Sequence, residues 1–167
     1  PGVITARPGG VGRNIAHDLR LLGAEVSLVT AVGGDVYGQG ILASCRELGI
    51  DMSLARILPE RRSSTYLYVT DETGDMQIGI ADMEITGCIT PEYLASRMEE
   101  INGFDAVVLD ANLSAESVEY AARHCAVPII ADPVSTAKAM RLLPVLGCLW
   151  AIKPNIYEAE KLTGEQD

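Results

Sequence analysis

Helix-like and strand-like segments alternate along this chain, and that alternation restricts it to a small set of folds. Residues 11–22 carry apolar side chains at helical spacing, which predicts a helix. Residues 25–32 are mostly apolar and rich in β-branched residues, as in a strand buried on both faces. Further strands are predicted at 106–109, 128–131 and 148–152, and further helices at 37–48, 91–101, 115–124 and 155–162. Strands that alternate with helices pair in parallel, so the sequence predicts an α/β fold with a mostly parallel sheet.

The middle of the chain departs from this alternation. Residues 64–70 and 76–81 have the composition of strands, and the segment between them contains Gly74. This pattern predicts a β-hairpin with a turn of about five residues. We expect one of its faces to be wetter than the other, as at the solvent-facing edge of a sheet.

The charge and the cysteines exclude several classes of function. With 13 Lys and Arg against 23 Asp and Glu, the formal net charge is −10. Nucleic acids and anionic membrane surfaces are polyanions, so neither is an expected partner. No apolar run reaches the roughly 18 residues of a membrane-spanning helix. The four cysteines are widely spaced, which fits a reducing compartment, and we expect a cytoplasmic protein.

A glycine-rich loop precedes the first predicted helix. The adjacent residues Gly9 and Gly10 would let a ligand approach the backbone, and N–H groups at a helix start favour anions or hydroxyl oxygens. A tight turn that only leads into the helix explains the same pattern equally well. The loop lacks the third glycine of the dinucleotide-binding fingerprint and the Gly-Lys-Ser/Thr of a P-loop.

Polar residues follow two of the predicted strands. Asp110 and Asn112 come after the strand at 106–109, and Asp132 follows the strand at 128–131. Open α/β sheets bind ligands at the carboxyl ends of their strands, so these side chains are candidates for a binding site. Asp and Asn also cap turns, and that simpler role remains open.

The last predicted helix opens with Asn155, and Glu158 lies three positions later. An Asn at the N-cap with a Glu at the third helical position is close to a capping box. The same two side chains could instead hold a hydrated Mg²⁺ near phosphates, since Mg²⁺ keeps several waters and needs only one or two carboxylates.

Three segments, in this order, resemble the signatures of ribokinase-like (PfkB-type) carbohydrate kinases. Gly9–Ala16 resembles the N-terminal sugar-site signature, Ala31–Gly38 the second glycine segment, and Lys153–Gly164 the Asn-x-x-Glu segment. Within that family, the stretches at 10–14, 81–83, 110–113 and 132–135 are most similar to the pseudouridine kinase subgroup. The resemblance spans residues 1–167. It implies part of a kinase domain with a three-layer α/β/α fold and a small β lid at about residues 52–84.

The resemblance also implies an activity, which is transfer of the γ-phosphoryl group of ATP to a sugar hydroxyl, here the 5′-hydroxyl of pseudouridine. It assigns sugar hydroxyls to Gly9, Gly10 and Asn14, and base or sugar recognition to Arg13. Asn112 stands where some relatives place a sugar-contacting Glu.

The cofactors and partners implied are those of the family. The resemblance assigns an indirect role at Mg²⁺ and phosphate to Asn155 and Glu158, and it makes K⁺ a candidate additional cofactor. The partner is a small-molecule sugar or nucleoside, and a second copy of the chain is expected to pair through the β lid.

Two family features have no counterpart in the 167 residues. One is the catalytic Asp of a Gly-Ala-Gly-Asp-like anion hole, and the other is an early strand Asp that grips the sugar. We therefore expect a kinase domain truncated at both ends, and no turnover by these residues alone, because they lack the general base and the anion hole.

Other functions remain open at this point. The chain could belong to a ribokinase-like enzyme that acts on ribose, fructose or a purine nucleoside. It could be a non-catalytic remnant that binds or dimerises. A dinucleotide-binding oxidoreductase is the third class, and the missing third glycine argues against it.

Overall fold

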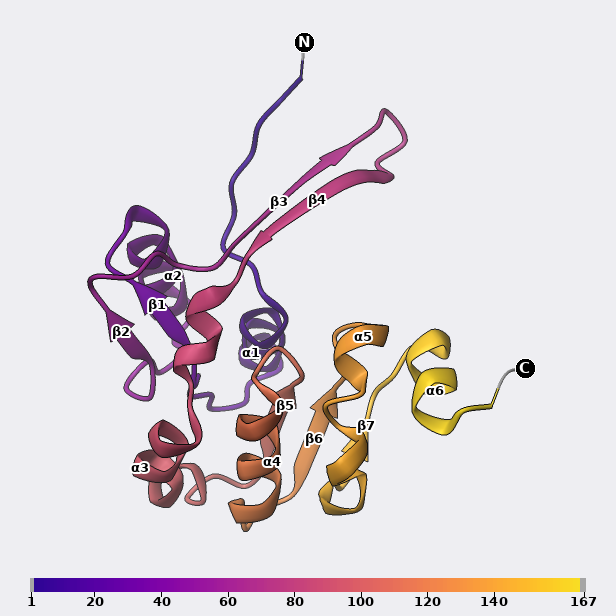
Figure 1. The fold of residues 1–167 in the computed structure, drawn as a ribbon. Coiled ribbons are helices and arrows are strands. Elements are labelled where there is room, and N and C mark those ends of the chain that lie inside the picture. Colours follow the sequence, from indigo (N-terminus) through magenta and orange to yellow (C-terminus); the bar gives the residue numbers. More distant parts are fainter. Residues whose placement is uncertain (1, 166–167) are drawn as a thin grey trace. The chain divides into compact units, whose positions relative to one another are not determined.

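The computed structural model describes residues 2–165 and falls into two compact units, one ending at Cys88 and one beginning at Ile89. Figure 1 shows the helices and strands of both. Within the described residues, no helix combines the length and the apolar character needed to cross a membrane.

The first unit contains two short parallel strands, a hairpin and two long helices. β1 pairs in parallel with β2, and β3 pairs antiparallel with β4. The elements in chain order are α1 (Val11–Leu21), β1 (Ala31–Gly33), α2 (Val36–Glu47), β2 (Arg56–Leu58), β3 (Thr65–Thr70), β4 (Met76–Asp82) and the 3₁₀ helix η1 (Glu84–Cys88).

The predicted helices of this unit are confirmed to within one residue at each end. Their packing is aliphatic, because Ala16 of α1 and Cys45 of α2 are buried together with Ile50. α2 ends in a turn at Gly49, whose φ of 71° is accessible to glycine at little cost.

The strand predicted at 25–32 is wrong in its extent. Only Ala31–Gly33 forms a strand, and the earlier part makes a single parallel bridge between Ser27 and Asp51. The partner segment turns directly after that bridge, where the Ala55 N–H donates to the Met52 carbonyl at 3.0 Å. Because of this turn, the ladder stops at Asp51 and resumes only at β2.

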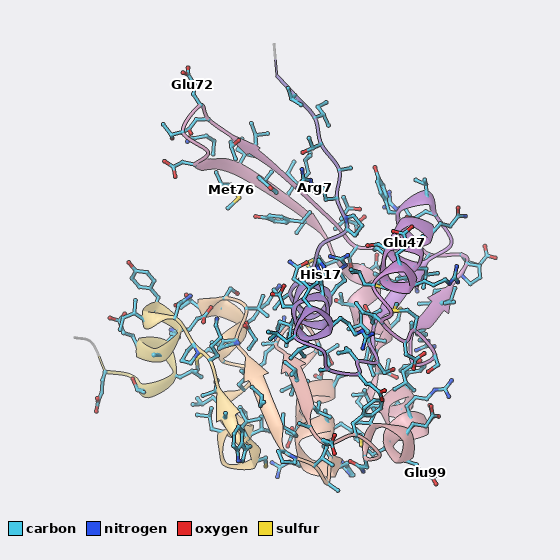
Figure 2. The ribbon with its side chains drawn as sticks, turned by 180° about the vertical axis from the view of Figure 1, so that it is seen from behind. Arg7, His17, Glu47, Glu72, Met76 and Glu99 are labelled. Carbon is cyan, nitrogen blue, oxygen red and sulfur yellow. The ribbon has the colours of Figure 1, made fainter. Side chains whose placement is uncertain are left out.

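The predicted hairpin is confirmed, but its two faces do not differ in exposure. Every residue of β3 and β4 is exposed. Residues paired across the strands share a face, so Leu67 and Val69 lie beside Ile80 and Ile78 and form one aliphatic face. Figure 2 labels Glu72 in the turn of the hairpin and Met76 at the start of β4. In the described part of the chain, neither face of this hairpin is covered.

The second unit has a three-stranded parallel sheet in the order β5–β6–β7. The buried Ser117 hydroxyl donates to the Ile89 carbonyl at 2.7 Å, which ties α4 to the start of this unit. The elements are α3 (Pro91–Ile101), β5 (Val107–Asp110), α4 (Ala115–His124), β6 (Ile129–Asp132), α5 (Thr136–Ala139), the 3₁₀ helix η2 (Leu143–Cys148), β7 (Ala151–Ile152) and α6 (Ile156–Thr163).

Hydroxyl side chains cap the first two helices of this unit. Thr90 caps α3 ahead of Pro91, and Ser114 caps α4 by accepting a hydrogen bond from the Ser117 N–H. The strand predicted at 148–152 is shorter than expected, because Cys148 still belongs to η2. This 3₁₀ helix has a proline in its first turn, a position where the missing N–H is tolerated.

Candidate functional site

The glycine loop leads into α1 without a side-chain cap. Gly10 is the N-cap residue, with φ 99° and ψ 137°, and it has no side chain to accept a hydrogen bond. Gly9 and Gly10 are exposed, and a Cβ at either position would meet no atom within 4 Å. The side chain of Asn14 is also exposed, one turn into the helix. The backbone here is therefore accessible, and its predicted part in ligand binding stays a prediction.

Arg13 lies on the same helix as Asn14 but is less exposed to solvent. Its side chain is half-buried, and its Nη2 donates to the hydroxyl of Ser44 on α2 at 2.7 Å. Beside it, burial raises the pKa of the Cys45 thiol. The guanidinium thus links α1 to α2, and its predicted part in base or sugar recognition stays a prediction.

The second glycine segment is held by a carboxylate. Asp35 caps α2, and its Oδ1 accepts hydrogen bonds from the Gly38 N–H at 2.8 Å and the Ser63 hydroxyl at 2.7 Å. Its Oδ2 accepts from the Ser63 N–H at 2.9 Å. The buried Ser63 hydroxyl accepts in turn from the Gly33 N–H at 2.9 Å. This network fixes the chain just before β3 and so anchors the base of the hairpin.

Two glycines in this segment are required by close backbone approach. A Cβ on Gly33 would lie 2.7 Å from the Ser63 backbone nitrogen, and a Cβ on Gly34 would lie 2.8 Å from the Cα of Pro59. Real side chains do not tolerate such contacts with backbone atoms. The glycines therefore let the segments at 33–34 and 59–63 pack directly on one another.

The Asp35 network makes stability depend on pH. Hydrogen bonds from the Ser63 hydroxyl and from the Gly38 and Ser63 N–H groups hold the pKa of Asp35 below its ordinary value of 3.8. Since the carboxyl binds its proton more weakly when folded, its stabilising contribution is complete above 3.8 and is lost as the pH falls through the folded-state pKa.

We expect the difference in thermal midpoint between wild type and Asp35→Asn to shrink as the pH is lowered from about 5 to about 2. Thermal unfolding of both proteins across that range, followed by circular dichroism, provides the measurement. A difference that stays constant with pH would show that the ionised carboxylate does not stabilise this segment.

In the second unit, a tight turn follows β5. The Asn112 N–H donates to Asp110 Oδ1 at 2.8 Å, and the Asn112 side-chain oxygen accepts from Lys138 Nζ at 2.7 Å. Arg141 Nη1 donates to the carbonyls of Ala111 at 2.9 Å, Asn112 at 3.2 Å and Leu113 at 2.7 Å. The candidate residue Asn112 is therefore rigidly placed at the carboxyl end of the sheet.

The neighbouring strand end is similarly constrained. Asp110 and Asp132 are register partners on β5 and β6. Asp132 Oδ1 accepts from the Val134 N–H at 2.8 Å, and Asp132 Oδ2 lies 3.9 Å from Lys153 Nζ. Val134 has a φ of 66°, which is unusual for a β-branched residue and costs backbone energy. Strain of this kind is concentrated at functional sites.

Asn155 and Glu158 form a full capping box at the start of α6. Asn155 Oδ1 accepts from the Glu158 N–H, and Glu158 Oε2 accepts from the Asn155 N–H, both at 2.9 Å. Glu158 is buried, while Asn155 is exposed. The capping box that the spacing of Asn155 and Glu158 indicates is therefore present.

The capping box does not conflict with a role at Mg²⁺. Within residues 2–165, no group of three or more His, Cys, Asp or Glu side chains could hold a metal ion. A mostly hydrated Mg²⁺ needs only one or two carboxylates, and Glu158 uses only Oε2 in the capping box. The donor set thus fits an ion that reaches this helix start through water or phosphate oxygens.

The glycine loop, the second glycine segment and the Asn-x-x-Glu helix start are the segments whose resemblance predicts a family of carbohydrate kinases. The family model for pfkB family carbohydrate kinases matches residues 2–167. The chain belongs to this family. Over 165 residues it is 42% identical to the pseudouridine kinase of Escherichia coli K12, covering 98% of this chain and 53% of that protein.

Solved structures place this pfkB chain in the ribokinase-like α/β fold. A carbohydrate kinase from Agrobacterium tumefaciens superposes with a TM-score of 0.86 at 32% identity, covering 95% of this chain and 53% of that one. A protein from E. coli described as a ribokinase II, in complex with ATP and Mg²⁺, superposes with a TM-score of 0.85 at 16% identity, covering 100% of this chain and 58% of that one. This pfkB chain spans about half the length of the relatives it matches.

In this pfkB chain, three residues that the sequence patterns do not indicate contact the candidate segments. Ser63 lies in no motif, and it becomes important only because the fold brings it to Asp35. Lys138 and Arg141 lie in a segment for which no helix was predicted, yet both bind the turn at Asn112. In the sequence, only the spacing of these two cationic residues, three positions apart, hints that both could reach one site.

Proposed function

We propose that the protein to which this chain belongs is an ATP-dependent kinase that phosphorylates the 5′-hydroxyl of pseudouridine, and that these residues form its acceptor-binding part. The 42% identity to the E. coli pseudouridine kinase, extending over 98% of the chain, carries the proposal. The open backbone at Gly9 and Gly10 supports it, since exposed amides at a helix start suit hydroxyl oxygens.

Each candidate residue has a role within this proposal. Gly9, Gly10 and Asn14 bind ribose hydroxyls, and Arg13 contributes to recognition of the base or the sugar. Asn112 contacts the substrate from the end of β5. The hairpin closes over the bound nucleoside and excludes water, as lids do in enzymes that must protect a phosphoryl group from hydrolysis.

The cofactors of the proposed reaction are ATP and Mg²⁺. A neighbour of the same fold binds both, and Asn155 and Glu158 fit an indirect part at the metal and phosphates. Mg²⁺ would neutralise charge that develops on the transferred phosphoryl group. K⁺ is a further candidate cofactor, and the low cysteine content favours a cytoplasmic location.

A substrate panel tests the proposal. The full-length protein is incubated with Mg²⁺ and ATP and with pseudouridine, uridine, inosine, ribose or fructose, in K⁺ and in Na⁺ buffers. We expect the highest kcat/KM with pseudouridine and a 5′-monophosphate as product. A clear preference for ribose, fructose or inosine would assign the protein to another branch of the family. The 167-residue chain, assayed in parallel, should give no turnover, because it lacks the family's catalytic Asp.

We also propose that two copies of the protein pair through the hairpin. On its aliphatic face, Leu67 and Val69 are each 55% exposed, and Ile78 and Ile80 are each 60% exposed. An exposed apolar face on a two-stranded ribbon is marginal in water and favours association. A second copy would cover that face with the same residues, as in isologous dimers.

Leu67→Glu should raise the dissociation constant of this dimer about tenfold or more, since burying a carboxylate without a partner is costly. Light scattering of the full-length protein over a range of concentrations measures the effect. Thr73→Glu adds the same charge in the exposed turn of the hairpin and should leave the dimer intact. Equal masses for wild type and Leu67→Glu at every concentration would contradict pairing through this face.

A further inference from the structure

Asn112 is held at three of its hydrogen-bonding groups. Its N–H donates to Asp110 Oδ1, its backbone carbonyl accepts from Arg141 Nη1, and its side-chain oxygen accepts from Lys138 Nζ at 2.7 Å. Its side chain is half-buried. A residue restrained in this way cannot reorient freely, so the direction in which its amide points is a property of the fold.

The hydrogen bond from Lys138 determines which way the Asn112 side-chain amide points. A lysine ammonium has three donors and no acceptor, so the amide atom that faces Lys138 must be Oδ1. Nδ2 then lies on the other side of the planar amide group and carries two N–H donors. Within residues 2–165, Asn112 Nδ2 donates no hydrogen bond to the protein. The group that Asn112 offers to a ligand is therefore a donor.

The loop that precedes α5, the helix that carries Lys138, is held in a costly conformation. Val134 adopts a φ of 66°, with its N–H fixed by Asp132 Oδ1 at 2.8 Å. Ser135 then accepts from the Lys138 N–H at 3.4 Å and starts the short helix α5. Such strain persists only where the surroundings enforce it. The restrained loop thus fixes the start of α5, and with it the position from which Lys138 reaches Asn112.

We propose that Lys138 is a positioning residue that turns the Asn112 amide so that Nδ2 donates to an acceptor oxygen of the substrate. This inference rests on the proposed function. Pseudouridine offers two kinds of acceptor, the carbonyl oxygens of its base and the oxygens of its ribose.

The decisive substitution is Asn112→Asp. Aspartate has nearly the same shape and can still pair with Lys138, but it has no N–H to donate. We expect kcat/KM for pseudouridine to fall about tenfold or more, which is the size of one lost hydrogen bond in a site that then holds an unmatched acceptor. An Asn112→Asp enzyme as efficient as wild type would overturn the proposal.

Substitutions of Lys138 test the positioning role separately. In Lys138→Met the amide can rotate, so we expect KM to rise several-fold while kcat stays within about twofold, whereas Lys138→Arg keeps a donor and should restore most of the loss. Arg123→Met, at an exposed position on α4, removes one positive charge away from the turn and should leave both constants unchanged. Equal KM values for Lys138→Met and wild type would overturn the role of Lys138.

Comparison of two acceptors distinguishes the source of the oxygen. If Asn112→Asp weakens pseudouridine but leaves any turnover of free ribose unchanged, the oxygen is a base carbonyl. If both substrates lose equally, it belongs to the ribose. Either outcome supports donation by Asn112 and locates its partner.

A spectroscopic measurement separates this inference from the proposed function. The side-chain ¹⁵N amide signal of Asn112 in the full-length protein is identified by its loss in Asn112→Asp. We expect Lys138→Met to shift or broaden it in the free protein, and added pseudouridine to shift it in wild type. If no nucleoside or sugar is phosphorylated, the proposed function fails, and the response to Lys138→Met still decides whether the lysine orients the amide. An unchanged signal in Lys138→Met would overturn the inference.

Discussion

Gly38→Ala should lower the free energy of unfolding by about 3 kcal/mol or more, which is at the upper end for overpacking a well-filled site. A Cβ at this position would lie 2.7 Å from the Ser63 hydroxyl oxygen and closer still to the Gly33 carbonyl oxygen. The Ser63 hydroxyl cannot retreat without breaking its bonds to Asp35 and Gly33. We therefore expect the added methyl group to disrupt the whole network at the base of the hairpin. Urea denaturation of both proteins measures the change.

The matched control for this substitution lies two residues further along the same helix. A Cβ on Gly40 would meet nothing within 4 Å, and Gly40 is exposed. Gly40→Ala should therefore stabilise the protein by roughly 0.5–1 kcal/mol, because alanine is the better helix former. If the two alanine variants unfold at the same urea concentration, the close approach at Gly38 is not a constraint on this fold.

The second large effect is expected at Glu158. Glu158→Gln keeps a side-chain oxygen that can accept from the Asn155 N–H, and glutamine also serves at this position of a capping box. It removes the negative charge that we propose acts on the Mg²⁺ and phosphates. We therefore expect unfolding to change by less than about 0.5 kcal/mol, while kcat/KM falls about 10- to 100-fold, as is typical when a group that supports a metal site is lost.

Two further variants separate the structural role of this helix start from its functional role. Asn155→Ala removes the cap and should cost about 1 kcal/mol of stability. Glu158→Asp keeps the charge on a shorter side chain, so it should retain more activity than Glu158→Gln when Mg²⁺ is raised. Activity is measured in the full-length protein as a function of Mg²⁺ concentration. Full activity of Glu158→Gln at every Mg²⁺ concentration would show that the capping box is the whole role of this residue.

The long elements of the fold could be predicted because their signals are local. The helix at 91–101 is bounded by Thr90 and Pro91, and α6 by Asn155 and Gly164, so short stretches of sequence suffice to locate them. The strand at 25–32 was overestimated because its length depends on a distant partner. The chain turns between Met52 and Ala55, and no pattern within residues 25–32 records that turn.

For the candidate site, the sequence indicates the family but not the contacts that hold the candidate residues. The glycine loop and the Asn-x-x-Glu segment carry recognisable spacing, and the family they indicated is confirmed. The roles of Ser63, Lys138 and Arg141 arise from contacts between residues 26 to 30 positions apart, such as Lys138 with Asn112 and Ser63 with Asp35. Such contacts depend on tertiary packing and leave no periodic trace in the sequence.

The decisive measurement is the structure of the full-length protein with bound pseudouridine. We expect ribose oxygens within hydrogen-bond distance of the Gly9–Gly10 backbone and the Asn14 side chain. We also expect a substrate oxygen facing Asn112 Nδ2, with Lys138 still bound to Asn112 Oδ1. A nucleoside that binds elsewhere and touches none of these residues would contradict the assignment of this chain as the acceptor-binding part of a pseudouridine kinase.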